Sequence, residues 1–227
     1  MEITPEQERQ LHRLVEAFLE ENANINLSAF RTPESCWTGN VLDSLSALDL
    51  EEVQRLPEGA QFLDIGTGGG FPLLPLAICL PQHSFTGLDA TQKKIDAVGR
   101  IAATLGLRNI RLACGRTEEL GRLEEFRDRF DCVTARGLAP LNVLLEYAAP
   151  FTRPKGHIVA WKSMTIDQEL TESLLARAEL SSHLVRRHAY ELPADFGKRQ
   201  LLVFEKTAKT PKKYPREIGV PKKQPLI

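Results

Sequence analysis

The feature that most constrains this chain is a run of glycines at the end of an apolar segment. Phe62-Leu63-Asp64-Ile65 leads into Gly66-Thr67-Gly68-Gly69-Gly70, and a helix-like stretch follows. Glycine allows backbone angles that other residues rarely adopt, and it lets a ligand approach the main chain. In a doubly wound α/β sheet this turn lies at the carboxyl end of the first strand, where nucleotide-like cofactors bind. The segment therefore predicts a strand, a cofactor loop and a helix.

From residue 60 onward, short apolar runs alternate with amphipathic stretches. The expected strands span 62–65, 84–88, 110–114, 132–135, 157–161, 184–190 and 200–205. The expected helices span 72–80, 92–105, 117–126, 140–149 and 166–180. Strands and helices that alternate in this way form a mostly parallel sheet with helices on both faces. We therefore expect an α/β, Rossmann-like fold with a mostly parallel seven-stranded sheet.

The residues before this alternation have a helical pattern. Thr4-Pro5-Glu6-Gln7 carries the cap, the first-turn proline and the third-position glutamine of a helix start. A second helix is expected to begin at Thr32-Pro33, after a polar turn over 22–30. The sequence thus predicts a helical extension ahead of the sheet.

An acidic residue in the second predicted strand adds to the cofactor argument. Asp89 ends that strand about 20 residues after the glycines, where a carboxylate can accept hydrogen bonds from both ribose hydroxyls. The dinucleotide fingerprint requires a glycine where Phe71 stands. Asp64 fits the Asp-x-Gly-x-Gly-x-Gly pattern of methyltransferases, in which a carboxylate can hold the amino-acid portion of S-adenosylmethionine. A class I methyltransferase is favoured over an NAD-dependent oxidoreductase, which remains the alternative.

The net charge of −1 hides an uneven distribution. From residue 206 onward the only acidic residue is Glu217, against the basic residues Lys206, Lys209, Lys212, Lys213, Arg216, Lys222 and Lys223. A basic segment can hold a polyanion through phosphate contacts and counterion release. We expect an N-terminal helical extension over 1–58, a methyltransferase domain over 59–206, and a basic, Pro-rich tail over 207–227 that runs extended over the surface.

Other compositional features exclude several classes of protein. The longest apolar stretch is far shorter than the roughly 20 residues of a membrane span, and the acidic start does not have the pattern of a signal peptide. We expect a cytoplasmic protein. The histidines have no metal-ligand spacing, and no metal is expected. The four cysteines are widely spaced and predict small core residues, namely Cys36, Cys79, Cys114 and Cys132.

Several motifs in the same order resemble those of the RsmG (GidB) family. Ahead of the loop these are Asn24-Ile25-Asn26-Leu27-Ser28 and Asp43-Ser44-Leu45, and at the loop Asp64 to Pro72 and Pro75 to Ile78. After it come Lys93-Lys94, Gly115 to Glu119, Phe130 to Arg136, Ala139 to Leu141, Tyr214-Pro215-Arg216, Gly219, Pro221 and Pro225-Leu226. The family methylates guanine N7 in 16S ribosomal RNA. The chain departs from its pattern at Asn40, where the family often has histidine, and at Lys155 and Ser163, which replace glycines.

The resemblance implies a set of binding residues. The cofactor is S-adenosyl-L-methionine, with S-adenosyl-L-homocysteine as product, and the implied contacts are Gly66, Phe71, Asp89, Ala90, Thr91, Thr117, Glu118 and Arg136. Asn26 is a candidate RNA contact on family grounds. Basic residues expected near the cofactor mouth are candidate phosphate contacts, namely Lys93, Lys94, Lys162, Arg199 and Arg216.

The segment after the fourth predicted strand bears on the methyl acceptor. Residues 135–140 have no Asn/Asp-Pro-Pro-aromatic motif of the kind that binds exocyclic amines, and Cys132 lies in a strand rather than in a nucleophile loop. Guanine N7 carries no proton, so its methylation needs no general base. Arg136 is expected to orient the base or the cofactor. Because A-form RNA hides N7 in its deep groove, the target should lie in a loop or be splayed out.

The expected function is methylation of guanine N7 in small-subunit RNA, free or in the 30S particle, by a monomer. A methyltransferase for a small molecule or a protein, and a non-catalytic ribosome assembly factor, remain the alternatives.

Overall fold

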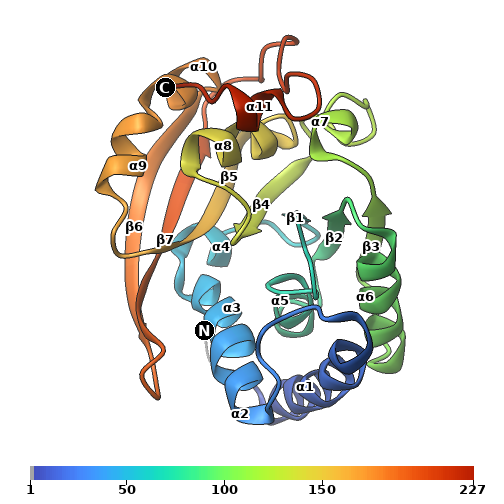
Figure 1. Cartoon of the computed structure of the whole chain (residues 1–227). Helices are drawn as coiled ribbons and strands as arrows, with labels where there is room; N and C mark the ends of the chain where they lie inside the picture. The colour runs from blue at the N-terminus through green and yellow to red at the C-terminus, as the bar shows by residue number, and fades with distance from the viewer. Residues whose placement is uncertain (1–2) are drawn as a thin grey trace.

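Residues 3–227, which the computed structural model describes, form a seven-stranded sheet with the strand order β3-β2-β1-β4-β5-β7-β6 (Figure 1). The strands are β1 (Gln61–Ile65), β2 (Ser84–Asp89), β3 (Ile110–Cys114), β4 (Phe130–Arg136), β5 (Thr152–Ser163), β6 (Ser182–Leu192) and β7 (Gly197–Lys206). Adjacent pairs among β1 to β5 are parallel, and β7 is antiparallel to both β5 and β6. The predicted α/β fold is confirmed, and each predicted strand has a counterpart.

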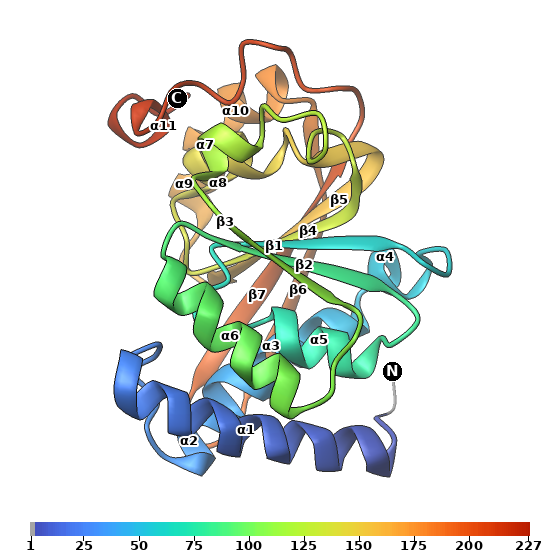
Figure 2. The ribbon, with the colours of Figure 1, turned by 90° about the vertical axis from the view of Figure 1, so that its right-hand side faces the viewer.

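Helices cover both faces of this sheet (Figure 2). The helices between the glycine loop and β6 are α5 (Leu73–Cys79), α6 (Gln92–Thr104), α7 (Thr117–Leu120), α8 (Leu141–Ala148), α9 (Asp167–Glu172) and α10 (Leu174–Glu179). Because neighbouring side chains of a strand point to opposite faces, Phe62 packs into the core with α5 and α6, and Leu63 into the core with α8 and α10. The predicted helices at 117–126 and 166–180 are shorter than expected, and Ser173 separates the latter into two.

The first helix, α1 (Pro5–Ile25), lies beneath α5 and α6 (Figure 2). The predicted capping box is present, with Thr4 Oγ1 accepting from the Gln7 amide at 3.2 Å. The helix continues three residues past Asn22, where the sequence predicted a turn. The Asn22 side chain is buried, and its Oδ1 accepts from the amides of Leu27 and Ser28, just beyond the end of the helix. This asparagine organises the turn that follows the helix.

A second helical segment begins at Pro33, capped by Thr32 as predicted. It changes geometry along its length, through α2 (Pro33–Cys36), the π-helix η1 (Trp37–Leu42), α3 (Asp43–Leu45), the 3-10 helix η2 (Ser46–Asp49) and α4 (Glu51–Gln54). A π-helix widens the backbone and is frequent at functional sites. Here it brings Gly39 and Asn40 against the end of β4.

The C-terminal segment differs from the extended tail that the sequence predicted. It lies over α7 and α8 and contains the short helix α11 (Val220–Lys223) (Figure 1). Arg127 donates hydrogen bonds to the carbonyl oxygens of Thr210 and Tyr214, at 2.7 and 2.9 Å. Backbone carbonyls that accept from a half-buried guanidinium fix the path of the segment.

Two further observations concern the cysteines and the length and polarity of the helices. Cys36, Cys79 and Cys132 are buried as predicted, but Cys114 is exposed because it ends the edge strand β3. Within residues 3–227, the helices are all too short or too polar to cross a membrane.

Candidate functional site

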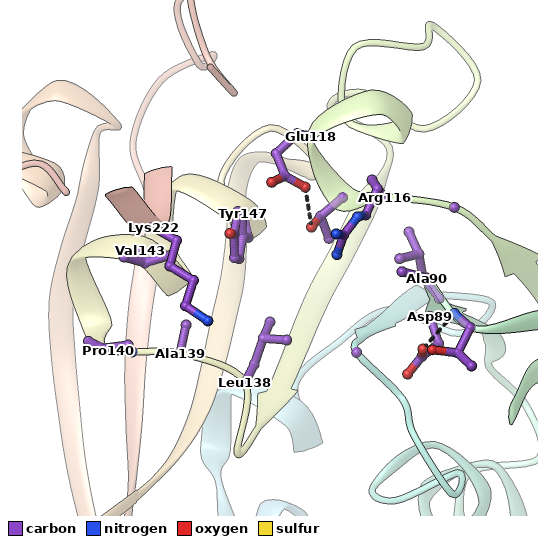
Figure 3. Close-up of a pocket in the computed structure, with 15 residues that line it drawn as sticks. Asp89, Ala90, Arg116, Glu118, Leu138, Ala139, Pro140, Val143, Tyr147 and Lys222 are labelled. Carbon is purple, nitrogen blue, oxygen red and sulfur yellow. Dashed lines mark hydrogen bonds between the residues drawn. The ribbon is translucent and has the colours of Figure 1, made fainter. Parts of the chain in front are cut away.

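A cavity of about 460 Å³ lies at the carboxyl ends of the parallel strands (Figure 3). The ends of β1 and β4 flank the position where the strand order reverses, which is where ligands bind in open α/β sheets. The cavity is lined by Gly66, Leu88, Asp89, Ala90, Thr91, Gly115, Arg116, Thr117, Glu118, Leu138, Ala139, Pro140, Val143, Tyr147 and Lys222. The structure therefore brings together six of the predicted cofactor residues, namely Gly66, Asp89, Ala90, Thr91, Thr117 and Glu118.

The glycine loop follows β1 directly. Gly66 and Gly68 have φ angles of +69° and +55°, which side-chain-bearing residues rarely adopt. A Cβ atom on Gly66 would lie 2.6 Å from Leu138 Cδ1, across the cavity floor. The glycines thus permit both the turn and the close approach of the loop after β4.

Asp89 holds the loop from the neighbouring strand. Its Oδ2 accepts from the Gly68 amide at 3.0 Å and its Oδ1 accepts from the Thr91 amide at 2.9 Å. Each carboxylate oxygen has a further lone pair for a ligand hydroxyl. The side chain is buried but borders the cavity, as expected for a residue that binds ribose hydroxyls.

Asp64 in β1 has a buried carboxylate that suits a ligand carrying an ammonium group. Its Oδ1 accepts from the Thr134 hydroxyl at 2.8 Å, whereas its Oδ2 is buried with no hydrogen-bond partner in residues 3–227. Burial raises the pKa of Asp64 to about 6, and the neighbouring hydroxyls of Thr67 and Thr134, followed by the positive charge of Arg136, offset part of that rise. A buried, unsatisfied carboxylate oxygen is costly unless a donor reaches it. An ammonium group held at the glycine loop is such a donor.

Thr117 and Glu118 begin the short helix α7 on the upper wall of the cavity. Glu118 is buried, and its Oε2 accepts from the Thr117 hydroxyl at 3.3 Å (Figure 3). Its Oε1 accepts from the Gly219 amide at 3.0 Å, so the C-terminal segment contacts a predicted cofactor residue. Burial and the negative charges of Glu118 and Glu146 raise the pKa of Tyr147, which therefore stays protonated and able to donate.

Phe71 and Arg136, the other two predicted cofactor residues, lie outside the cavity lining. The Arg136 guanidinium lies 5.8 Å from the centre of the Phe71 ring. Arg136 donates to the Gly39 carbonyl at 2.9 Å, to Asn40 Oδ1 at 2.7 Å and to Asp43 Oδ2 at 2.8 Å. The end of β4 is thereby joined to the N-terminal helical extension. Within the described residues 3–227, the Nε–H of Arg136 makes no hydrogen bond.

Asp43 is the centre of this network. Its carboxylate is fully buried and also accepts from the Tyr190 hydroxyl at 2.6 Å, while Arg199 Nη1 lies 3.4 Å away. Burial and the Asp43 charge raise the pKa of Tyr190. The Asp43 carbonyl accepts from Trp161 Nε1 at 2.8 Å. One acidic residue thus links the helical extension to four strands of the sheet.

The predicted RNA contacts fall into two groups. Asn26 and Lys93 are exposed, and Lys94 is half-buried; both lysines lie at the start of α6, close to Thr91 in the cavity wall. The other three are held by carboxylates: Lys162 by Glu169 at 2.6 Å, Arg199 by Asp43, and Arg216 by Glu146 at 2.6 Å. Lys162 also donates to the Ala139 carbonyl at 2.9 Å, which braces the cavity wall.

Arg116, Tyr147 and Lys222 also line the cavity, although no sequence pattern predicted them as site residues. Arg116 directly precedes the predicted Thr117-Glu118 pair, and that position was the available signal. The contribution of Lys222 depends on the folding of the C-terminal segment, which no local pattern shows.

The fold and the site define a class I methyltransferase. Among solved structures the chain is similar to a SAM-dependent methyltransferase from Aquifex aeolicus, with a TM-score of 0.56 at 18% identity over 76% of this chain and 93% of that one. It is also similar to a precorrin-6y C5,15-methyltransferase from Geobacter metallireducens, with a TM-score of 0.54 at 15% identity over 81% and 92% of the two chains. At these identities the likeness concerns the fold.

The family is defined by sequence. The model of the GidB family, described as rRNA small subunit methyltransferase G, matches residues 7–192, and the chain belongs to this family. It is 41% identical to the ribosomal RNA small subunit methyltransferase G of Deinococcus deserti over 96% of this chain and 88% of the relative. It is 36% identical to the protein of that name from an Exiguobacterium species over 100% and 94%. Family and fold together agree with S-adenosylmethionine as the cofactor.

Proposed function

We propose that the protein transfers a methyl group from S-adenosylmethionine to N7 of a guanine in small-subunit (16S) ribosomal RNA. The observation that carries the proposal is the cavity at the glycine loop, formed within a chain that belongs to the family of small-subunit RNA methyltransferases. The names of the relatives give the RNA. The guanine N7 target is what the family resemblance implies, and the chemistry of the site is compatible with it.

Bound S-adenosylmethionine supplies an electrophilic methyl group, and the chain's own residues hold and orient the reactants. Asp64 and the loop from Gly66 to Gly70 would hold the amino-acid portion, and Asp89 the ribose hydroxyls. Thr117 and Glu118 would border the adenine end. Placement of this kind supplies most of the rate enhancement when no proton has to move.

The part of the cavity wall that follows β4 is compatible with a methyl acceptor that needs no general base. Its cavity-lining residues Leu138, Ala139 and Pro140 carry no ionisable side chain. Guanine N7 offers a lone pair and no proton, so an apolar wall that excludes water is sufficient beside it. Arg136 would orient the base or the cofactor from the end of β4, through the guanidinium edge that its three hydrogen bonds leave open.

The RNA backbone would be held at the rim of the cavity. Lys93 and Lys94 stand one and two residues after the start of α6, and Asn26 is exposed at the end of α1. The other three basic residues would contribute on the RNA-facing side while they remain paired with their carboxylates. They are Lys162, Arg199 and Arg216. The partner would be the 16S RNA or the 30S particle, and the protein a cytoplasmic monomer.

The experiment is methyl transfer from labelled S-adenosylmethionine to unmodified 30S subunits and to naked 16S RNA. Label recovered as 7-methylguanosine, and lost in Asp89→Ala, supports the proposal. Label in another nucleoside would overturn the N7 target alone. Cofactor binding without label in either RNA would overturn the ribosomal substrate.

A further inference from the structure

The segment 207–227, here called the C-terminal strap, forms part of the cavity although it lies beyond the residues that the family model matches. Backbone contacts fix its first half. Besides the contacts of Arg127, Arg122 donates to the Pro215 carbonyl through Nη2 at 2.8 Å and Nε at 3.1 Å. Two arginines of the sheet domain thus hold the backbone of the strap between Thr210 and Pro215.

Two buried carboxylates of the sheet domain hold the second half. Glu146 on α8 is fully buried, and it accepts from the backbone amide of Arg216 at 2.9 Å and from the Arg216 guanidinium at 2.6 Å. Glu118 accepts from the Gly219 amide at 3.0 Å. Because a buried carboxylate is costly when it is left unpaired, both contacts oppose detachment of the strap.

These two contacts determine where the following short helix lies. Gly219 adopts a φ of +79°, and Pro221 is buried against the domain. The next residue, Lys222, extends along the cavity wall towards Leu138 and Ala139, opposite Asp89 and Ala90 (Figure 3). Its ammonium group makes no hydrogen bond or ion pair with any residue in the described range 3–227. Its positive charge therefore faces the cavity without a direct ion-pair partner among the described residues.

The position of Lys222 in the cavity indicates which reactant its ammonium group contacts. The groups assigned to the cofactor, Asp89, Thr117 and Glu118, come from the β2 and β3 side, and Asp64 and the glycine loop from β1. Lys222 instead lies beside the loop after β4, which adjoins the acceptor base in the proposed function. A lysine ammonium on a flexible stem is a point-charge ligand for phosphate.

We propose that Lys222 is a positioning residue that binds a phosphate next to the target nucleotide of the RNA. This inference rests on the proposed function, because it requires an RNA acceptor. The strap would thereby close the acceptor side of the cavity and place its one inward-facing cation on the backbone of the splayed-out base.

The test compares Lys222→Met with Lys222→Arg and with the matched control Lys223→Met. Lys223 is the next residue, is also exposed, and lies outside the cavity lining, so its variant removes the same charge from the same helix. For each protein one would measure the KM for unmodified 16S RNA or 30S subunits, kcat, the Kd for S-adenosylmethionine in the absence of RNA, and the salt dependence of RNA binding.

Lys222→Met should raise the KM for RNA about tenfold, as expected for one charged contact, and leave the Kd for S-adenosylmethionine unchanged. The slope of log affinity against log salt should fall by about 0.7 in magnitude, the value for one phosphate of a single strand. Lys222→Arg should restore most of the KM, and Lys223→Met should behave as the wild type. An unchanged Kd for the cofactor also shows that Lys222→Met is folded.

Three results would overturn the inference. Equal RNA KM values for Lys222→Met and Lys223→Met, in an active enzyme, would exclude a specific contact. A weakened cofactor Kd with an unchanged RNA KM would assign Lys222 to the cofactor carboxylate instead. If the wild type methylates neither RNA, the proposed function fails, and the phosphate role fails with it.

Discussion

Arg136 and Asp43 lie 93 residues apart in the chain, and their side chains form an ion pair of 2.8 Å in which the Asp43 carboxylate is fully buried. The pair joins the end of β4, beside the glycine loop, to the helical extension that precedes the sheet. Because Tyr190 donates to the same carboxylate, the loss of Asp43 would leave several polar groups without an acceptor.

Asp43→Ala should lower the free energy of unfolding by about 3 kcal/mol, the usual cost of breaking a buried pair. Urea denaturation of the cofactor-free protein measures it. Asp167→Ala removes an exposed ion pair with Arg187 and should change stability by less than about 1 kcal/mol. Similar losses for the two variants would contradict a structural role for the Asp43 network.

Arg136→Ala should lower kcat about 100-fold, the order expected when reactants are misplaced. Arg136→Lys keeps the charge but loses the planar fork that reaches Asn40 and Asp43 together, so it should recover only part of the activity. Single-turnover methyl transfer at saturating RNA and cofactor measures the effect. Normal turnover by the alanine variant would remove Arg136 from the proposed mechanism.

Asp64 should make cofactor binding and stability depend on pH in opposite directions. Its pKa is raised from 3.8 to about 6 by burial, so the folded protein binds this proton more tightly than the unfolded chain does. The Asp64 contribution to stability therefore falls as pH rises from about 4 to 6, and the penalty persists above pH 6. The affinity for S-adenosylmethionine should instead fall below pH 6, as the carboxylate is protonated.

Asp64→Asn tests this reasoning. The variant should be more stable than the wild type at pH 7.5 by on the order of 3 kcal/mol, and it should bind S-adenosylmethionine more weakly. Denaturation at pH 4.5 and 7.5 and calorimetric titration with the cofactor measure both effects. A variant that is destabilised at pH 7.5 would show that the carboxylate is satisfied in the free protein.

Gly66→Ala should abolish measurable cofactor binding. The added methyl group would lie 2.6 Å from Leu138 Cδ1 and would displace the glycine loop that holds the ligand. Gly106→Ala is the matched control: its φ is +70° against +69° for Gly66, but nothing lies within 4 Å of the added Cβ. Both substitutions should cost about 1–2 kcal/mol of backbone strain. Cofactor titration and thermal unfolding separate the two effects, and equal cofactor affinities would contradict the placement of the loop.

The elements that sequence alone could predict are those with a local cause. The apolar runs of β1 to β5, the Thr4–Gln7 capping box and the glycine loop with Asp89 are all visible within a few residues of each other or at a known spacing. Contacts between distant residues gave no such signal. Arg216 was predicted from its charge as a phosphate ligand, yet its guanidinium is paired with Glu146, 70 residues away. Glu118 and Gly219 are 101 residues apart, and Lys222 joins the cavity only because that contact forms.

The two backbone amides on the Asp89 carboxylate have a consequence for binding kinetics. Gly68 and Thr91 are tied to it by hydrogen bonds that involve protein groups alone, so the loop has little conformational freedom left to lose when a ligand arrives. Binding energy that would otherwise be spent on ordering the loop is retained as affinity. The cofactor should enter a rigid receptor in a single step, and the amide of Gly68 should be slow to exchange with solvent before the cofactor binds as well as after.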